Sequence, residues 1–104
     1  MENKFKIIYL PVARKDLIEI VHYINNDLNA PISANNLLNE IEIAILRLAD
    51  FPFSCPQYFG DKNLKNDYRY LAVKNYIIFY VIFKNTVEIR RIIYARRNIN
   101  TIIN

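Results

Sequence analysis

Hydrophobic and polar residues alternate with two different periods along this chain. A short apolar stretch at residues 5–10 ends at Pro11, and aliphatic residues then recur every three or four positions from 13 to 48. This spacing predicts two amphipathic helices. Pro11 and Pro31 stand near the two expected helix starts, where proline is tolerated. The break at 29–31 is short, so the helices should form an antiparallel hairpin.

The second half of the chain has the composition of β-strands. Three segments rich in β-branched and aromatic residues, 68–73, 76–83 and 86–95, are separated by Lys74-Asn75 and Lys84-Asn85. Asn tolerates positive φ, so both dipeptides are expected to form two-residue hairpin turns. The unbroken apolar run 76–83 indicates the central strand.

The order β-α-α-β-β-β predicts an α+β fold in which a helical hairpin covers one face of a mainly antiparallel sheet. We expect a single core that contains side chains from both helices and from the central strand, namely Leu17, Ile24, Leu38, Ile41, Ile45, Phe79 and Val81.

Arginines interrupt the pattern of the last strand. With Val87 and Ile89 facing the core, strict alternation would also bury Arg91. Either Arg91 buries its stem and keeps its head in water, or a bulge near Arg90-Arg91 shifts the register so that Ile92 and Tyr94 face the core. Both solutions hold guanidinium groups on rigid β structure, where they are suited to bind carboxylate or phosphate.

Composition narrows the class of protein. A chain of 104 residues is expected to form one domain, 1–104. The single Cys55 excludes an internal disulfide, no secretory leader is recognised, and no apolar run is long enough to span a bilayer. We therefore expect a soluble cytoplasmic protein. Residues 1–60 carry a net charge of −2 and residues 61–104 a net charge of +6, which predicts a basic working surface in the second half.

Several kinds of chemistry are missing from the sequence. The single glycine, Gly60, excludes a glycine-rich phosphate loop, and one histidine, His22, with one cysteine excludes the usual zinc sites. The acid pairs Asp16/Glu19 and Glu40/Glu42 are interpreted as solvated helix faces. We expect neither a metal nor a cofactor.

The remaining candidates are basic and aromatic. They form a predicted binding set for an anionic partner, made of Arg69, Tyr70, Lys74, Arg90, Arg91, Tyr94, Arg96 and Arg97. A ribonuclease without histidine could use such arginines to stabilise phosphate charge and a tyrosine as acid or base. Tyrosine stacking with arginines at phosphates would equally describe a binding protein. Tyr70 and Tyr94 could also be ordinary sheet residues.

One ordered set of motifs carries a family resemblance. The segment Tyr68-Arg69-Tyr70-Leu71 is followed by Asn75-Tyr76 and Tyr80, then by Val87-Glu88-Ile89 and finally by Arg96-Arg97-Asn98. This order and spacing resemble the RelE/ParE superfamily of toxins from type II toxin–antitoxin systems, nearest its ParE-like (plasmid stabilisation) branch. The resemblance covers nearly the whole chain.

The resemblance implies a protein that halts growth unless a cognate antitoxin binds it. RelE-like members cleave mRNA in the ribosome, and ParE-like members inhibit DNA gyrase. RelE-like nucleases have an arginine directly after the tyrosine that opens the central strand, whereas this chain has Ile77 there. They also have a catalytic tyrosine after the last arginine pair, whereas residues 99–103 of this chain contain no tyrosine. An apolar side chain cannot stabilise phosphate charge.

We therefore expect a gyrase inhibitor that acts without a cofactor and without chemistry of its own. The alternative is a ribosome-dependent mRNA endonuclease, for which Arg69, Tyr94 and Arg97 are the catalytic candidates. A third possibility is a module that binds its antitoxin but has lost toxicity. The antitoxin segment is expected to be amphipathic and acidic, with carboxylates against some of Arg69, Arg90, Arg91 and Arg96.

Overall fold

The computed structural model describes residues 4–59 and 67–97. Its elements follow the predicted order: β1 (Lys6–Tyr9), α1 (Pro11–His22), a π-helical turn η1 (Tyr23–Asp27), α2 (Pro31–Leu46), a 3₁₀ turn η2 (Arg47–Ala49), β2 (Tyr68–Val73), β3 (Tyr76–Phe83) and β4 (Thr86–Tyr94). The predicted α+β class is confirmed, and the last three strands match their predicted bounds to within one residue.

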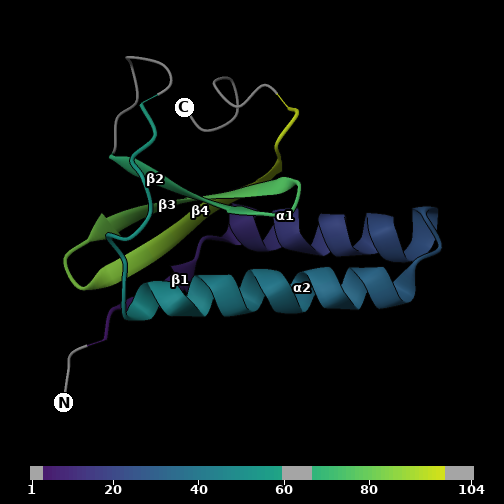
Figure 1. The fold of residues 1–104 in the computed structure, drawn as a ribbon, viewed down its shortest axis with the longest axis horizontal. Helices are drawn as coiled ribbons and strands as arrows, with labels where there is room; N and C mark the ends of the chain where they lie inside the picture. Colours follow the sequence, from purple (N-terminus) through teal and green to yellow (C-terminus); the bar gives the residue numbers. More distant parts are fainter. Residues whose placement is uncertain (1–3, 60–66, 98–104) are drawn as a thin grey trace.

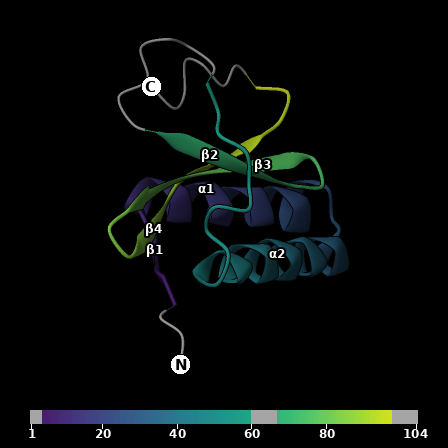
Figure 2. The same cartoon turned by 60° about the vertical axis from the view of Figure 1, so that its left-hand side comes forward.

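The strands form one sheet in the order β1-β4-β3-β2. β1 runs parallel to β4, and the β4/β3 and β3/β2 pairs are antiparallel. The two helices lie side by side on one face of this sheet (Figures 1 and 2). As predicted, β3 is an inner strand with a partner on each side.

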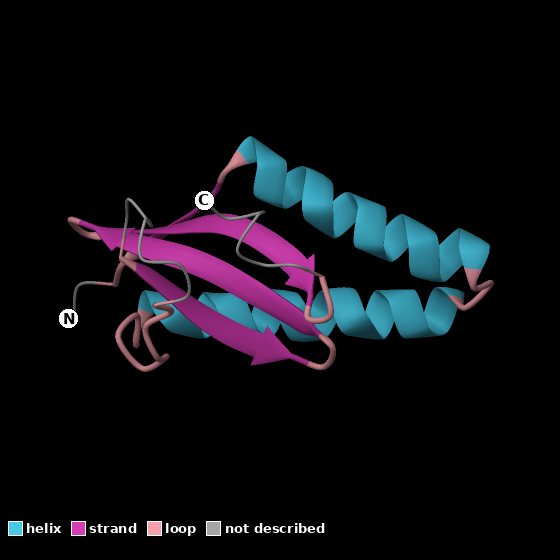
Figure 3. Ribbon diagram, turned by 90° about the horizontal axis from the view of Figure 1, so that it is seen from above, coloured by secondary structure: helices cyan, strands magenta, loops and turns pink. Residues whose placement is uncertain are grey.

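The helical hairpin begins and turns at simple local signals. Pro11 and Pro31 occupy the first turns of α1 and α2, where no backbone donor is lost. Between the helices Asn29 adopts a left-handed φ of 52°, which reverses the chain. The end of the hairpin that carries this turn projects beyond the sheet (Figure 3), so part of its inner surface has no strand to cover it.

The two hairpin turns differ in detail from the prediction. The residues with left-handed backbone are Lys74 (φ 53°) and Lys84 (φ 56°), and not the asparagines that follow them. Lysine has a Cβ that makes this conformation unfavourable, so the strand pairing on both sides of each turn must enforce it. The positions of both turns are nevertheless as predicted.

A β-bulge lies in β4, as one of the two sequence alternatives required. Tyr80 pairs with Ile89 and Phe79 with Arg91, so Arg90 is the extra residue. The bulge lets both Ile89 and Ile92 face the helices, where they are buried in one cluster. Without it, the side chain of Ile92 would lie on the opposite face.

The buried residues form two clusters, so the expectation of one core is wrong. Ile41 and Ile45 belong to the large cluster between helices and sheet, and Leu17 and Ile24 pack at its edge. Phe79 and Val81 lie on the other face of the sheet, in a smaller cluster with Tyr68 and Ile93. They alternate with Ile78 and Tyr80 along β3, and a strand buried on both faces must contribute to two clusters. Leu38 is half-buried and belongs to neither cluster.

The segment after α2 is fastened to the sheet. The buried Tyr80 hydroxyl donates a hydrogen bond to the Pro52 carbonyl at 2.8 Å, and burial raises the pKa of this hydroxyl. Further along, Tyr58 N–H donates to the Tyr68 carbonyl and Tyr70 N–H to the Pro56 carbonyl. The segment therefore lies along the outer edge of β2.

Truncation of a buried helix residue tests this packing. Ile41 is fully buried on the inner side of α2, so Ile41→Ala should lower the free energy of unfolding by about 2–5 kcal/mol. Ile43→Ala removes the same atoms from an exposed position on the same helix and should change it by less than about 0.5 kcal/mol. Urea unfolding followed by circular dichroism measures both. Equal losses would contradict the assignment of the two helix faces.

Candidate functional site

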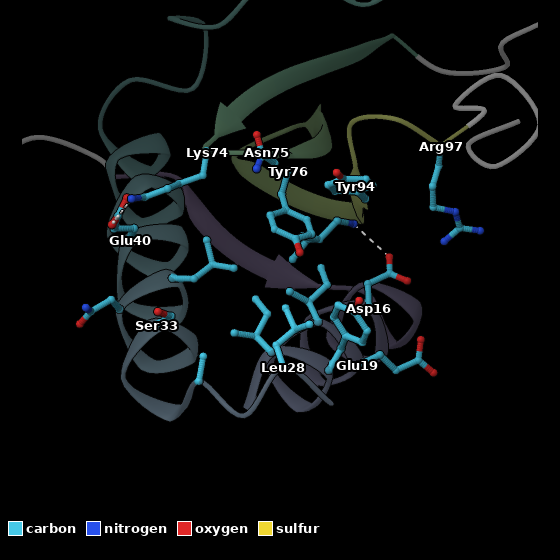
Figure 4. A pocket seen from close by; sticks show the side chains of 17 residues that line it. Asp16, Glu19, Leu28, Ser33, Glu40, Lys74, Asn75, Tyr76, Tyr94 and Arg97 are labelled. Carbon is cyan, nitrogen blue, oxygen red and sulfur yellow. Dashed lines mark hydrogen bonds and ion pairs between the residues drawn. The ribbon is translucent and has the colours of Figure 1, made fainter. Parts of the chain in front are cut away.

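An open groove of about 890 Å³ lies where the projecting hairpin passes the end of the sheet. Its apolar walls come from the inner side of α1 and η1 and from the ends of β3 and β4: Ile20, Tyr23, Ile24, Leu28, Tyr76, Ile92 and Tyr94. In Figure 4 Tyr76 points into the groove from the sheet and Leu28 faces it from the hairpin. The groove is the uncovered continuation of the main core.

Large apolar side chains in the groove remain open to solvent. Leu28 is 54% exposed and Tyr23 is 49% exposed, although both follow the apolar spacing of the first helix. The Tyr76 and Tyr94 rings lie 5.6 Å apart. Burial, followed by the neighbouring Tyr94 and Tyr23, raises the pKa of Tyr76 above its ordinary value, so this hydroxyl is a neutral hydrogen-bond donor at physiological pH. An exposed surface of this kind is suited to a partner segment with apolar side chains.

Charged residues stand at the rim of the groove. Lys74 and Glu40 form an exposed ion pair at 3.5 Å on one side. Glu19 and Arg97 also line the groove, and Figure 4 shows Arg97 on the side opposite Glu40. The rim therefore presents both signs of charge around an apolar floor.

Asp16 joins the first helix to the bulged strand. Its carboxylate accepts hydrogen bonds from Arg91 Nε at 2.7 Å and Nη2 at 3.0 Å, and from the Ile92 backbone N–H at 3.0 Å. The hydrogen bonds to Asp16 raise the pKa of Arg91. The Asp16 side chain is only 11% exposed, which makes this contact more than a solvated surface pair. The interpretation of Asp16 as part of a solvated face is therefore wrong.

Two further predicted arginines also have partners inside the chain. Arg69 Nη1 donates to the Cys55 carbonyl at 2.6 Å, and its guanidinium lies 5.2 Å from the centre of the Phe53 ring. Arg90 pairs with Glu88 at 2.9 Å. Burial alone would lower the pKa of Arg90, but the hydrogen bond to Glu88 contributes to a net increase. Together with Arg91, these arginines already have structural contacts.

The last two arginines are different. Arg96 and Arg97 are exposed, and neither side chain has an ion pair or hydrogen bond with a residue in 4–59 or 67–97. Arg97, Tyr94 and Lys74 line the groove, with Arg97 and Lys74 on opposite sides. Tyr70 lies on the other face of the sheet, half-buried against Tyr58 with the two rings 6.2 Å apart. The predicted set therefore divides between the groove, the opposite face of the sheet and the contacts within the chain, and Arg96 is exposed in the turn after β4.

The three candidates for a nuclease do not converge. Arg69 pairs across the sheet with Tyr80, whereas Tyr94 pairs with Tyr76. Those two positions are four residues apart on β3, or about 13 Å along the strand. Arg97 lies with Tyr94 at the groove, so only two of the three candidates are neighbours.

Other kinds of site are limited by the composition of the described chain. In residues 4–59 and 67–97 no group of three or more His, Cys, Asp and Glu side chains could hold a metal ion. The single histidine, His22, is exposed and bonded to Asn26. Among the helices described, none has the length and apolarity required to cross a bilayer.

Sequence reasoning missed the groove and Asp16 for separate reasons. The apolar spacing of the first helix continues to Leu28, but the sequence does not show where the sheet stops and which part of this stripe it leaves uncovered. Asp16 lies 75 residues from Arg91. The sequence does indicate that an arginine in the last strand needs a hydrogen-bond acceptor. It does not indicate which of the carboxylates in the chain is that acceptor.

Comparison with known proteins gives consistent results. A family model described as "ParE toxin of type II toxin-antitoxin system, parDE" matches residues 7–99. A solved structure, described as the chromosomal ParDE TA system from P. aeruginosa, superposes with a TM-score of 0.72 at 16% sequence identity and covers 91% of this chain and 100% of that chain. No curated protein matches.

Removal of the Asp16 carboxylate tests its structural role. Asp16→Ala removes the carboxylate that accepts hydrogen bonds from the Arg91 guanidinium and the Ile92 N–H in a partly buried place, and should lower the free energy of unfolding by about 2–3 kcal/mol. Glu19→Ala, one turn further along α1 at an exposed position, should cost less than about 0.5 kcal/mol. Thermal unfolding of both variants provides the measurement. A melting temperature of Asp16→Ala equal to that of the parent would contradict the role assigned to this carboxylate.

Proposed function

This chain belongs to the ParE toxin family of type II toxin–antitoxin systems, and on that premise we propose that it inhibits DNA gyrase and is neutralised by a cognate antitoxin. It acts by binding and not by chemistry of its own side chains. The observation that carries this choice is that the three candidate catalytic residues do not converge: Arg69 lies about 13 Å along the sheet from Tyr94.

The residue that follows Tyr76 supports the same choice. Ile77 is half-buried and packs in the cluster on the sheet face opposite the helices, beside Phe79 and Ile93. A ribosome-dependent nuclease needs cations near the scissile phosphate. An isoleucine in this position contributes apolar packing instead, so the mRNA endonuclease remains the alternative.

Arg96 and Arg97 are the strongest candidates for the contact with gyrase. They stand in the turn that follows β4, where the Arg97 backbone N–H donates to the Tyr94 carbonyl, and both side chains are exposed. Arginine is over-represented among residues that dominate binding energy, because its planar head makes several directed hydrogen bonds.

We further propose that the antitoxin places apolar side chains in the groove beside Leu28 and Tyr76 and its carboxylates against Arg96 and Arg97. Three of the four arginines first expected to meet the antitoxin, Arg69, Arg90 and Arg91, have partners within the chain. To bind carboxylates of the antitoxin they would first have to release these partners. The electrostatic contact is therefore assigned to the end of β4.

The first test separates the two toxin mechanisms. The purified protein should inhibit supercoiling by gyrase and leave ribosome-bound mRNA intact. Arg97→Ala should weaken the inhibition about tenfold or more, while its free energy of unfolding changes by less than about 0.5 kcal/mol, because the side chain is exposed.

Lys84→Ala is the matched control, since it removes one exposed positive charge at the turn between β3 and β4. It should leave the inhibition unchanged. mRNA cuts on added ribosomes with unaffected gyrase would contradict the proposal and favour the nuclease. If neither target responds, the chain is an antitoxin-binding module without toxicity.

The second test concerns the antitoxin. Arg96→Ala should slow association and reduce its dependence on ionic strength, because rim charges act mainly on the encounter. Leu28→Ala should instead speed dissociation, because it removes apolar contact in the groove. Surface-immobilised antitoxin at several salt concentrations gives both rate constants.

Ile18→Ala is the control for the groove variant. Ile18 is an exposed aliphatic residue on α1 that does not line the groove, so its truncation should leave both rate constants unchanged. An association rate that does not depend on salt would show that the basic residues are not the docking site. An unchanged dissociation rate of Leu28→Ala would place the antitoxin outside the groove.

A further inference from the structure

The outer side of α2 carries an unusual surface. Three large aliphatic residues are exposed there, Ile32 (77%), Ile43 (55%) and Leu46 (63%), and the exposed Asn36 and Asn39 lie between them. This side is opposite the buried Leu37, Ile41 and Ile45. Figure 1 shows α2 on the outside of the molecule, with the sheet on its other side. More than half of each aliphatic side chain therefore remains open to solvent.

The spacing of these five residues is that of a helix–helix seam. From Ile32 the positions follow at intervals of four, three, four and three, ending at Leu46. This is the heptad spacing by which one helix presents a continuous stripe to another. The stripe runs the length of α2, from its first turn to its last. We call these five residues, Ile32, Asn36, Asn39, Ile43 and Leu46, the α2 seam.

The α2 seam is also free of charge. Helix α2 contains only two charged residues, Glu40 and Glu42, and neither belongs to the seam. The outer side of a surface helix ordinarily carries charged residues. A seam of aliphatic and amide side chains suits a partner surface of the same composition.

We propose that the α2 seam binds a second copy of this chain, with the two α2 helices antiparallel about a two-fold axis. In one register Ile32 of each copy faces Ile43 of the other, and Asn36 faces Asn39. Apolar side chains then meet apolar ones, and amides meet amides. The four residues Ile32, Asn36, Asn39 and Ile43 are therefore their own complement, as an isologous dimer requires, and Leu46 extends the seam beyond the paired part.

The antiparallel direction follows from the charges and the amides. A parallel pair would place Glu40 and Glu42 of both copies at the same level and would align the two helix dipoles unfavourably. In the antiparallel register Glu40 lies beside Ser33 of the second copy, and Glu42 lies beside Asn35. The paired asparagines fix the register at some cost in stability, as polar seam residues do in coiled coils.

A contact built mainly from one helix of 16 residues is small, so the dimer should be weak and form in the micromolar range. This inference does not depend on the gyrase or antitoxin proposals. The seam and the groove share only the rim residue Asn36, and the apolar groove walls at Tyr23 and Leu28 are not used.

The test is the mass of the purified 104-residue chain in solution. Sedimentation equilibrium over roughly 1–300 μM should show a rise from 12.4 kDa toward twice that mass. Ile43→Glu should weaken self-association at least ~100-fold, because it places a carboxylate against Ile32 of the other copy. Ile18→Glu, which adds the same charge at an exposed position of α1, should leave it unchanged.

A charge exchange tests the register itself. Ile32→Lys alone should be monomeric, like Ile43→Glu alone. The chain that carries both substitutions should recover the dimer, because each new lysine would face a new glutamate of the other copy. Circular dichroism should show that every variant is folded, since both positions are exposed.

Three outcomes would overturn the proposal. A parent chain that stays at 12.4 kDa over the whole concentration range would exclude the dimer. A dimer that survives Ile43→Glu would place the contact elsewhere. A double variant that stays monomeric would exclude the proposed pairing.

Discussion

The bulge at Arg90 is the constraint on which the arrangement of the last strand depends. It allows Ile89 and Ile92 to face the helices on either side of two arginines that could not be buried with them. The same displacement directs Arg91 toward α1, where Asp16 binds both its guanidinium and the next backbone N–H. The bulge therefore fixes the position of a helix as well as the register of a strand.

This fixed helix determines where a binding surface can form. α1 is held against β4, and the hairpin is longer than the sheet that it covers (Figure 3). The apolar stripe consequently continues past the last strand residues, and Leu28 remains partly open to solvent. Groove and core are made by the same periodic pattern. They differ only in whether a strand lies opposite.

The sequence predicted most of the fold because its signals were local. Strand bounds, helix starts and turn positions each depend on a few adjacent residues. Three other features depend on contacts between distant segments: the ion pair of Arg91, the second cluster around Phe79 and Val81, and the point near Leu28 where the sheet no longer covers the hairpin. The same difference between local signals and distant contacts applies to the candidate site residues. Arg96 and Arg97 are exposed as expected, whereas Arg69 was assigned to a surface and instead binds the Cys55 carbonyl.

The segment fastened along β2 affects the solubility of the folded chain. An uncovered edge strand can pair with the same edge of another molecule, and repeated pairing leads to aggregates. Residues 56–58 occupy the first half of the β2 edge, where they bond to Tyr68 and Tyr70. The preceding segment is held in place by two hydrogen bonds, from the Tyr80 hydroxyl to the Pro52 carbonyl and from Arg69 to the Cys55 carbonyl. Loss of either anchor would free a strand edge beside several exposed phenylalanines, so the first consequence of such a mutation would be precipitation at high concentration.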